Sequence, residues 1–260
     1  MSTVPEDGAL PAGPSRFNDY DILAEGYARE NETGPANAYY DRPAMLALAG
    51  DVAGRRILDA GCGSGPLSAE LRDRGAVVTG IDMSAGMLEL ARQRLGDDVR
   101  LQRADLESPL PFDDSSFDDV VSSLVLHYLQ DWTAPLAEFR RVLKSGGRLI
   151  LSVNHPSQAW PGRPGYGQPV YTVHRQPGGN ADYFATYSWT VDWTMGDQTA
   201  TMRFWHRPLH AMTAAFTAAG FRIGIVSEPQ PAPVARELFP DQFQFLTTHP
   251  NFLFFLLHAE

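Results

Sequence analysis

The sequence predicts an α/β fold in which a mostly parallel sheet carries helices on both faces. Short apolar segments alternate with segments of helical periodicity between residues 56 and 153, and the alternation returns after residue 208. This alternation is typical of parallel strands joined by helical crossovers. The chain has 260 residues, of which 43% are hydrophobic, enough for one large core. We therefore expect one domain over residues 16–260, preceded by a flexible tail over residues 1–15.

Each element of the alternating region follows from a local signal. Pro66 stands where the first turn of a helix tolerates proline, and Ser84 is an N-cap residue. Leu136 and Phe139 share one face of a third helical segment. We expect this helix to end before the Gly-Gly pair at residues 146–147. The predicted helices span residues 66–74, 84–95 and 133–144, and the predicted strands span residues 56–60, 76–81, 99–104, 119–124 and 148–153.

The C-terminal half changes character. Residues 155–206 are rich in Pro, Gly and aromatic residues, and polar and apolar side chains alternate from Tyr187 to Trp193. Because a period of two is typical of a strand with one buried face, we expect a small antiparallel, aromatic-rich insertion in the same domain, with one face turned inward. The pattern then continues with a helix over residues 208–219, a strand over residues 221–227, a proline-rich loop and a last strand over residues 252–258.

Composition and charge argue against several function classes. The chain has 21 Lys and Arg against 31 Asp and Glu, a net charge of −10, which disfavours a nucleic acid partner because the phosphate backbone is polyanionic. The longest apolar run, residues 252–257, is far shorter than the about 20 residues of a membrane span. Cys62 is the only cysteine and the first residues lack the pattern of a secretory signal, so we expect a cytoplasmic location. No metal-ligand cluster is evident, and no metal is expected.

The most informative segment is ILDAGCGSGP at residues 57–66. It joins a buried strand to a helix through a glycine-rich turn, which lets a ligand approach the backbone outside the carboxyl end of the strand. The glycines at positions 61, 63 and 65 do not match the dinucleotide fingerprint G-x-G-x-x-G, and the G-K-[ST] of a phosphate-binding P-loop is absent. The loop therefore predicts a small ligand of another class.

The loop resembles the D-x-G-x-G-x-G motif of the class I S-adenosylmethionine (SAM) dependent methyltransferases, specifically the small-molecule branch that includes ubiquinone and menaquinone biosynthesis methyltransferases (methyltransferase type 11). The resemblance continues in order over residues 55–153, with GIDMS at residues 80–84, ADL at residues 104–106 and RVLKSGG at residues 141–147. It implies a Rossmann-like, seven-stranded, mostly parallel sheet with an antiparallel last strand. It also implies SAM as the cofactor and S-adenosylhomocysteine (SAH) as the product.

The resemblance assigns cofactor contacts to individual residues. Asp82 is expected to accept hydrogen bonds from both ribose hydroxyls, Asp105 to bind the adenine amino group, and Asp59 to position the loop and the methionine amino group. In relatives an N-terminal helix with tyrosines closes over the cofactor, so residues 16–50 are expected to form a helical lid. Met87 is either a wall of the adenine site or a core residue. The predicted cofactor residues are Asp59, Gly61, Gly63, Gly65, Asp82, Met83, Met87, Asp105, Leu106, Ser123, Leu124, Tyr20 and Tyr27.

Methyl transfer from a sulfonium proceeds by in-line displacement, so the protein mainly aligns the reactants and excludes water. A general base is needed when the acceptor must lose a proton, and His155 and His206 are the candidates, each alternatively a structural histidine. The aromatic insertion predicts an apolar or aromatic small-molecule acceptor with an O, N or C nucleophile. The predicted walls of the acceptor pocket are His127, Trp160, Tyr187 and Trp189. His127 is alternatively a capping or core residue, and the aromatic residues are alternatively the buried face of a small sheet.

Other functions remain open at this point. A nonenzymatic SAM-binding regulator would carry the same cofactor residues. A nucleic acid amino-methyltransferase is disfavoured because SSLV at residues 122–125 stands where those enzymes carry [N/D]-P-P-[Y/F]. A nicotinamide-dependent dehydrogenase is disfavoured by Pro66 and by the glycine spacing. We expect a monomer or a homodimer that acts on a small molecule.

Overall fold

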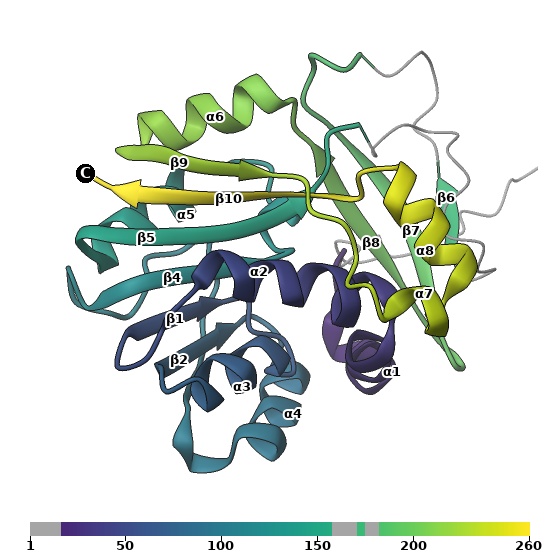
Figure 1. The fold of residues 1–260 in the computed structure, drawn as a ribbon, viewed down its shortest axis with the longest axis horizontal. Helices are drawn as coiled ribbons and strands as arrows, with labels where there is room; N and C mark the ends of the chain where they lie inside the picture. The colour runs from purple at the N-terminus through teal and green to yellow at the C-terminus, as the bar shows by residue number, and fades with distance from the viewer. Residues whose placement is uncertain (1–16, 158–170, 175–181) are drawn as a thin grey trace, which may run out of the picture.

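A seven-stranded sheet, parallel over most of its width, forms the centre of the molecule (Figure 1). The structure is a computed structural model that describes residues 17–157, 171–174 and 182–260. The five strands β1 to β5 pair in parallel with their neighbours in the sheet, whereas β10 is antiparallel to both β5 and β9. The predicted fold class and the antiparallel last strand are therefore confirmed. The strand order is β3 (Arg100–Arg103), β2 (Val77–Asp82), β1 (Arg56–Ala60), β4 (Phe117–Ser123), β5 (Leu143–Asn154), β10 (Phe252–Ala259) and β9 (Phe221–Ser227).

Helices cover both faces of this sheet because successive strand residues point to opposite sides. Leu58 of β1 packs into the core on one face, and its neighbour Ile57 packs into the core on the other. The first face is covered by α5 (Thr133–Val142) and α6 (Leu209–Ala218), and the second by α2 (Arg42–Ala49), α3 (Pro66–Asp73) and α4 (Ala85–Leu95).

The turn between β1 and α3 requires its glycines. Gly61, Gly63 and Gly65 have φ angles of 86°, 54° and 80°, in the left-handed region that other residues rarely adopt. A Cβ on Gly61 would lie 2.3 Å from Cγ2 of Val125, and one on Gly65 would lie 2.7 Å from Cδ1 of Leu95. The turn can therefore pack closely against α4 and against the end of β4, where the functional site lies.

The N-terminal segment is helical, as predicted, and packs against a second sheet (Figure 1). It contains α1 (Tyr20–Thr33) and the π-helix η1 (Asn37–Asp41), which leads into α2. The second sheet is antiparallel and consists of β6 (Tyr171–His174), β7 (Tyr187–Met195) and β8 (Gln198–His206). One face of it turns inward against α1, as expected, in a buried cluster of Leu23, Val191, Ala200, Met202 and Phe204.

Two local predictions are wrong. The helix predicted over residues 133–144 ends at Val142, because Leu143 pairs with Phe117 of β4 and begins β5. The predicted proline-rich loop contains the short helices α7 (Ala235–Leu238) and α8 (Pro240–Thr248), and burial of Leu246 holds α8 against the sheet. The other predicted strands overlap the observed ones, and η2 (Gly96–Asp98) and η3 (Leu126–Tyr128) are additional single turns. The predicted tail over residues 1–15 and Trp160 lie outside the described residues.

Candidate functional site: a cofactor cavity at the carboxyl ends of the strands

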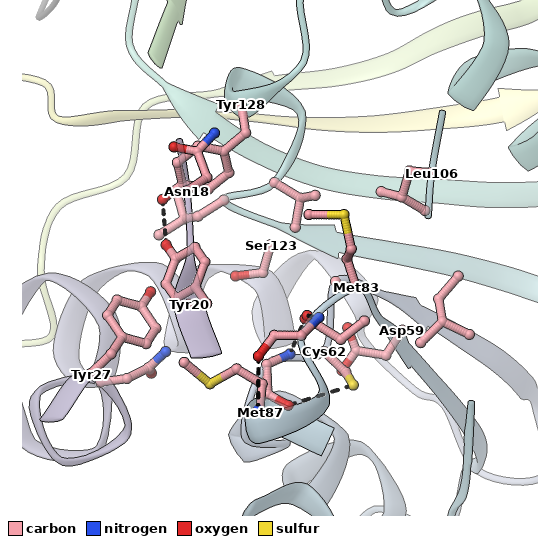
Figure 2. Close-up of a pocket in the computed structure, with 18 of the residues that line it drawn as sticks. Asn18, Tyr20, Tyr27, Asp59, Cys62, Met83, Met87, Leu106, Ser123 and Tyr128 are labelled. Atoms are coloured by element: carbon pink, nitrogen blue, oxygen red, sulfur yellow. Dashed lines mark hydrogen bonds between the residues drawn. The ribbon is translucent and has the colours of Figure 1, made fainter. Parts of the chain in front are cut away.

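A cavity of about 460 Å³ lies at the carboxyl ends of the parallel strands, within the range of about 300–1,000 Å³ that is usual for small-molecule sites. Its walls come from α1, the start of α2, the β1–α3 turn and the ends of β2, β3 and β4. In Figure 2, Tyr20 and Tyr27 stand on one side of the site, and Met83 and Leu106 stand on the other.

Asp82 connects the second strand to the glycine turn. One carboxylate oxygen accepts a hydrogen bond from the Gly63 amide at 2.9 Å, and the other accepts one from the Ser84 amide at 2.9 Å. Burial raises the pKa of Asp82, and these two amides oppose the shift. A Cβ on Gly63 would meet no atom within 4 Å. The turn thus leaves open space beside a partly buried carboxyl group, which fits a ligand with hydroxyl groups such as a ribose.

Asp59 at the end of β1 and Cys62 within the turn are both buried. Asp59 is 1% exposed and accepts a hydrogen bond of 2.6 Å from the Ser68 hydroxyl. Burial and the nearby charge of Asp82 raise the pKa of Asp59 to about 7. Burial also raises the pKa of the Cys62 thiol well above its usual value, which keeps the thiol protonated and makes it a poor nucleophile. These residues position the turn.

The ends of β2 and β3 form the outer part of the cavity. Met83 is 53% exposed, and Nε of Arg103 donates a 2.8 Å hydrogen bond to its carbonyl oxygen. Asp105 accepts a 2.9 Å hydrogen bond from the Glu107 amide, which orients the segment around Leu106. An apolar side chain and a carboxylate therefore meet there, an arrangement that suits an aromatic base with an amino group.

The end of β4 carries an unusual backbone conformation. Leu124 has a φ of 57°, although it is not glycine. Its amide donates hydrogen bonds to the carbonyl and hydroxyl oxygens of Ser152, each at 3.1 Å. Such a conformation costs of the order of 1–3 kcal/mol and is concentrated at functional sites. Ser123 and Leu124 both line the cavity, and Figure 2 shows Ser123 between Tyr20 and Met83.

Aromatic residues close the side of the cavity formed by α1. The hydroxyl oxygens of Tyr20 and Tyr128 lie 2.5 Å apart, and the rings of Tyr20 and Tyr27 meet edge to face with centroids 4.9 Å apart. Tyr27 stacks on Trp193 of β7 at 5.8 Å. Burial raises the pKa of Tyr20 well above its usual value, so its phenol stays neutral.

Polar contacts attach α1 and the residues before it to α4 on one side and to β8 of the second sheet on the other. The Asp21 carboxylate accepts hydrogen bonds from the Ser84 hydroxyl at 2.6 Å and the Gly86 amide at 2.9 Å, both at the start of α4. Asn18, just before α1, accepts a hydrogen bond of 2.7 Å from the Arg203 amide of β8. The helix is thereby held across the cavity.

The structure brings the predicted cofactor residues together, with one exception. Gly65 does not line the cavity; it precedes α3 and packs against Leu95. Met87 is 1% exposed, so it is a core residue, and it also lines the cavity. The predicted residues that line the cavity are Asp59, Gly61, Gly63, Asp82, Met83, Met87, Asp105, Leu106, Ser123, Leu124, Tyr20 and Tyr27.

The predicted acceptor-side residues are placed differently. His127 is 4% exposed, accepts a hydrogen bond from the Asn154 amide at 3.1 Å, and has its pKa lowered by burial to about 3. It is therefore a neutral structural residue, and its neighbour Tyr128 lines the cavity instead. On the second sheet, Tyr187 stacks on His206 and Trp189 stacks on Phe204. The cavity lining does not include His127, Tyr187 or Trp189.

Neither candidate base lines this cavity. Nε2 of His155 lies 2.7 Å from a Glu228 carboxylate oxygen, and its Nδ1 lies 2.7 Å from the Ser157 hydroxyl. Nε2 of His206 lies 2.8 Å from the Tyr183 carbonyl oxygen, and burial lowers the pKa of His206. Both ring nitrogens of His155 thus have protein partners, whereas Nδ1 of His206 is buried without a hydrogen-bond partner.

Sequence reasoning missed several polar residues of the cavity: Asn18, Asp21, Asn31, Asn37, Asp41, Arg42 and Arg103. Asp41 and Arg42 stand at the junction of η1 and α2, where no glycine or strand end marks a site. The only local signal in the sequence was the DRP triplet at residues 41–43, in which an acid and a base precede a proline that suits the first turn of a helix.

Comparisons with known proteins agree with this geometry. Residues 58–151 match the family model described as "Methyltransferase domain". The chain is 40% identical over 134 residues to a demethylmenaquinone methyltransferase of Clavibacter sepedonicus, covering 51% of this chain and 55% of that protein. It is 40% identical over 108 residues to a malonyl-[acyl-carrier protein] O-methyltransferase of Serratia marcescens, covering 42% of each. The chain thus spans about half the length of these curated relatives.

A solved SAM-dependent methyltransferase from Mesorhizobium loti superposes with a TM-score of 0.67 at 28% identity, covering 86% of this chain and 98% of that one. Residues 58–151 thus carry the match to the methyltransferase domain, and the fold as a whole is similar to that of a solved SAM-dependent methyltransferase. These findings support a class I SAM-dependent methyltransferase. Among the described residues, no helix is long and apolar enough to cross a membrane.

Proposed function

We propose that the chain transfers a methyl group from SAM to a small-molecule acceptor. The observation that supports this proposal is the partly buried Asp82 carboxyl, which the Gly63 and Ser84 amides hold at the edge of a cavity whose glycine turn leaves open space. A carboxylate placed there suits a ribose diol. The family match and the Mesorhizobium loti structure support SAM as the source of that ribose.

The sulfonium of SAM supplies an activated methyl group, so the protein needs no residue to activate the donor. Asp82 would hold the ribose, Asp105 and Leu106 the adenine, and the turn from Gly61 to Gly63 the methionine part. The hydroxyl contact between Tyr20 and Tyr128 and the stacking of Tyr27 close the cavity on the side of α1. These residues would orient the cofactor and exclude water.

The acceptor is proposed to be a small apolar or aromatic molecule. The relatives are named for methyl transfer to demethylmenaquinone and to malonyl-[acyl-carrier protein]. Proteins similar in sequence to this chain therefore act on two chemically different acceptors. Alignment and desolvation are the contributions that the cavity offers, and His155 and His206 remain predicted bases that need a different side-chain position to reach it. A cytoplasmic location and a monomer or homodimer also remain predictions from the sequence.

Methyl transfer can be tested with SAM carrying a labelled methyl group and a panel of phenols, quinols, amines and carboxylic acids. Transfer of label to an organic-soluble product would support the proposal. Binding of SAH without transfer to any acceptor class would favour a nonenzymatic regulator. Binding of NADH in place of SAH would favour a dehydrogenase, and it would contradict the proposal.

A further inference from the structure

The outer edge of strand β9 is open. β9 is the last strand of the seven-stranded sheet, and among the described residues no strand pairs with its outer side (Figure 1). Its inner side pairs with β10; the register shifts once, at Gly224, and the three residues that follow pair regularly again. The outward N–H and C=O groups of β9 therefore present a ladder that another strand can pair with.

The side chains of this edge are uncharged and partly apolar. Residues 223–227, which read IGIVS, separate Arg222 from Glu228. Ile225 is 43% exposed and Val226 is 47% exposed. The two lie on opposite faces of the sheet, because they pair with successive residues of β10 that pack into the cores on opposite faces. An apolar edge of this kind is a template for pairing with another chain.

The opposite edge of the same sheet is protected against such pairing. β3 has four residues, compared with seven for β9. Three of those four are polar, namely Arg100, Gln102 and Arg103. A short strand with charged side chains blunts an edge. β9 has neither of these protections.

The helix beside β9 also lacks charge. α6 packs next to β9 on one face of the sheet, and its ten residues, LHAMTAAFTA, include no Asp, Glu, Lys or Arg. Leu209 is 39% exposed, and the exposed positions of its later turns are Ala214, Thr217 and Ala218. A helix that faces water usually carries charged and polar residues on its outer side. α6 and β9 thus form adjoining uncharged surfaces.

We propose that β9 pairs antiparallel with β9 of a second copy of this chain, so that one sheet runs through a two-fold symmetric dimer. A two-fold interface needs a surface that is complementary to itself, and a strand paired antiparallel with its own copy meets this need. The pairing satisfies the open backbone groups of both copies and covers Ile225 and Val226. It also places the two α6 helices on the same face of the joined sheet.

The charges at the ends of β9 favour a second copy as the partner. Arg222 near the start of β9 and Glu228 just after its end have side chains that are 60% and 56% exposed. Antiparallel pairing brings Arg222 of each copy near Glu228 of the other and keeps like charges at opposite ends. Within the chain, Arg222 contacts Glu260 at 3.3 Å and Glu228 contacts His155 at 2.7 Å. Because exposed ion pairs contribute little energy, these charges mainly select the orientation.

Sedimentation velocity and light scattering of the full chain over a range of micromolar concentrations test the proposal. We expect twice the mass of the chain and no larger species, because two-fold pairing closes. Ile225→Lys adds a charge to the edge and should weaken the dimer at least tenfold. Leu238→Lys is the matched control, since Leu238 is 51% exposed on α7, away from β9 (Figure 1). It should leave the dimer unchanged, and thermal unfolding shows whether each variant is folded.

Charge reversal tests the antiparallel orientation. Arg222→Glu and Glu228→Arg should each weaken the dimer, because each brings like charges together. The double variant restores opposite charges and should recover most of the wild-type affinity. A double variant that dimerises as weakly as the single variants would contradict this orientation.

Three results would overturn the proposal. The first is a wild-type chain that stays monomeric, which would leave the β9 edge to a strand of another protein. The second is a dimer that folded Ile225→Lys does not weaken. The third is a mass that keeps rising with concentration, which would indicate open-ended association.

Hydrogen exchange of the wild-type chain decides the question if the variants do not fold. The amides of β9 should exchange more slowly at high protein concentration than at low concentration, because pairing protects them. Equal exchange of these amides at both concentrations would contradict the pairing.

Discussion

The hydroxyl oxygens of Tyr20 on α1 and Tyr128 on η3 lie 2.5 Å apart at the wall of the cofactor cavity. The contact joins residues that are 108 positions apart in the chain. It ties the N-terminal helix to the segment that follows β4, where the proposed methyl transfer takes place. The cover of the cavity is thus stabilised by a polar contact as well as by apolar packing.

This contact predicts a measurable coupling between Tyr20 and Tyr128. Tyr20→Phe and Tyr128→Phe should each reduce the free energy of unfolding by about 1 kcal/mol, the usual contribution of a net hydrogen bond. The double variant should lose less than the sum, because one interaction is removed in both cases. Urea denaturation of the four proteins gives the coupling, and additive losses would contradict the contact.

Asp21 should control the opening of α1. Its carboxylate accepts from the Ser84 hydroxyl and the Gly86 amide at the start of α4. Asp21→Ala should increase the dissociation rate of SAH several-fold and increase amide hydrogen exchange in α1. Glu25→Ala is a matched control on an exposed position of the same helix, and it should change neither quantity. Equal behaviour of the two variants would show that Asp21 does not hold the helix.

Asp59 should make the stability of the cofactor-free protein depend on pH. Its pKa of about 7 lies above the unfolded value of about 4, so the folded state binds the proton more tightly. The contribution of Asp59 to stability therefore falls as pH rises from about 4 to about 7. Asp59→Asn cannot ionise and keeps an acceptor for Ser68, so it should exceed the wild-type stability at pH 8 by on the order of 4 kcal/mol, which is about three pKa units at about 1.4 kcal/mol each.

The measurement for Asp59 is urea denaturation of both proteins from pH 4 to pH 8. The difference in unfolding free energy should vanish towards pH 4, because Asp59 is then protonated in the folded state. Asp98→Asn, on an exposed position of η2, is the control and should show no such trend. A difference that stays constant across this pH range would mean that Asp59 does not titrate as described.

The predicted bases have a kinetic test. If His155 or His206 removes a proton from the acceptor, His155→Asn or His206→Asn should lower kcat and leave SAH affinity unchanged. His249→Asn is a control, since His249 stacks on Phe245 of α8, away from the cavity lining. Unchanged kcat in both variants would assign the catalysis to alignment and desolvation.

The fold and most of the residues that line the cavity could be predicted because their signals are local. Gly61 and Gly63 need positive φ angles, and Asp82 follows directly after an apolar strand. Sequence patterns do not state where a side chain points after its strand ends. His127 therefore appeared as a wall of the acceptor site, whereas its ring turns to the Asn154 amide and is buried.

The Asp41 and Arg42 pair could not be predicted for a different reason. Its position depends on the π-helical turn of η1 and on contact with Ser123, which lies 82 residues away in the sequence. The length of β5 depends in the same way on a partner, since the pairing of Leu143 with Phe117 shortens α5. Contacts over such distances are decided by tertiary packing.

Calorimetric titration of SAH into the wild-type chain and Asp82→Ala tests the central claim most directly. Charge-assisted hydrogen bonds to a carboxylate contribute about 1.5–3 kcal/mol, so loss of the Asp82 carboxylate should weaken SAH at least tenfold. Thermal unfolding would establish that the variant is folded, and Asp98→Asn should bind SAH as the wild type does. SAH affinity in folded Asp82→Ala equal to that of the wild-type chain would contradict the assignment of this cavity to the cofactor.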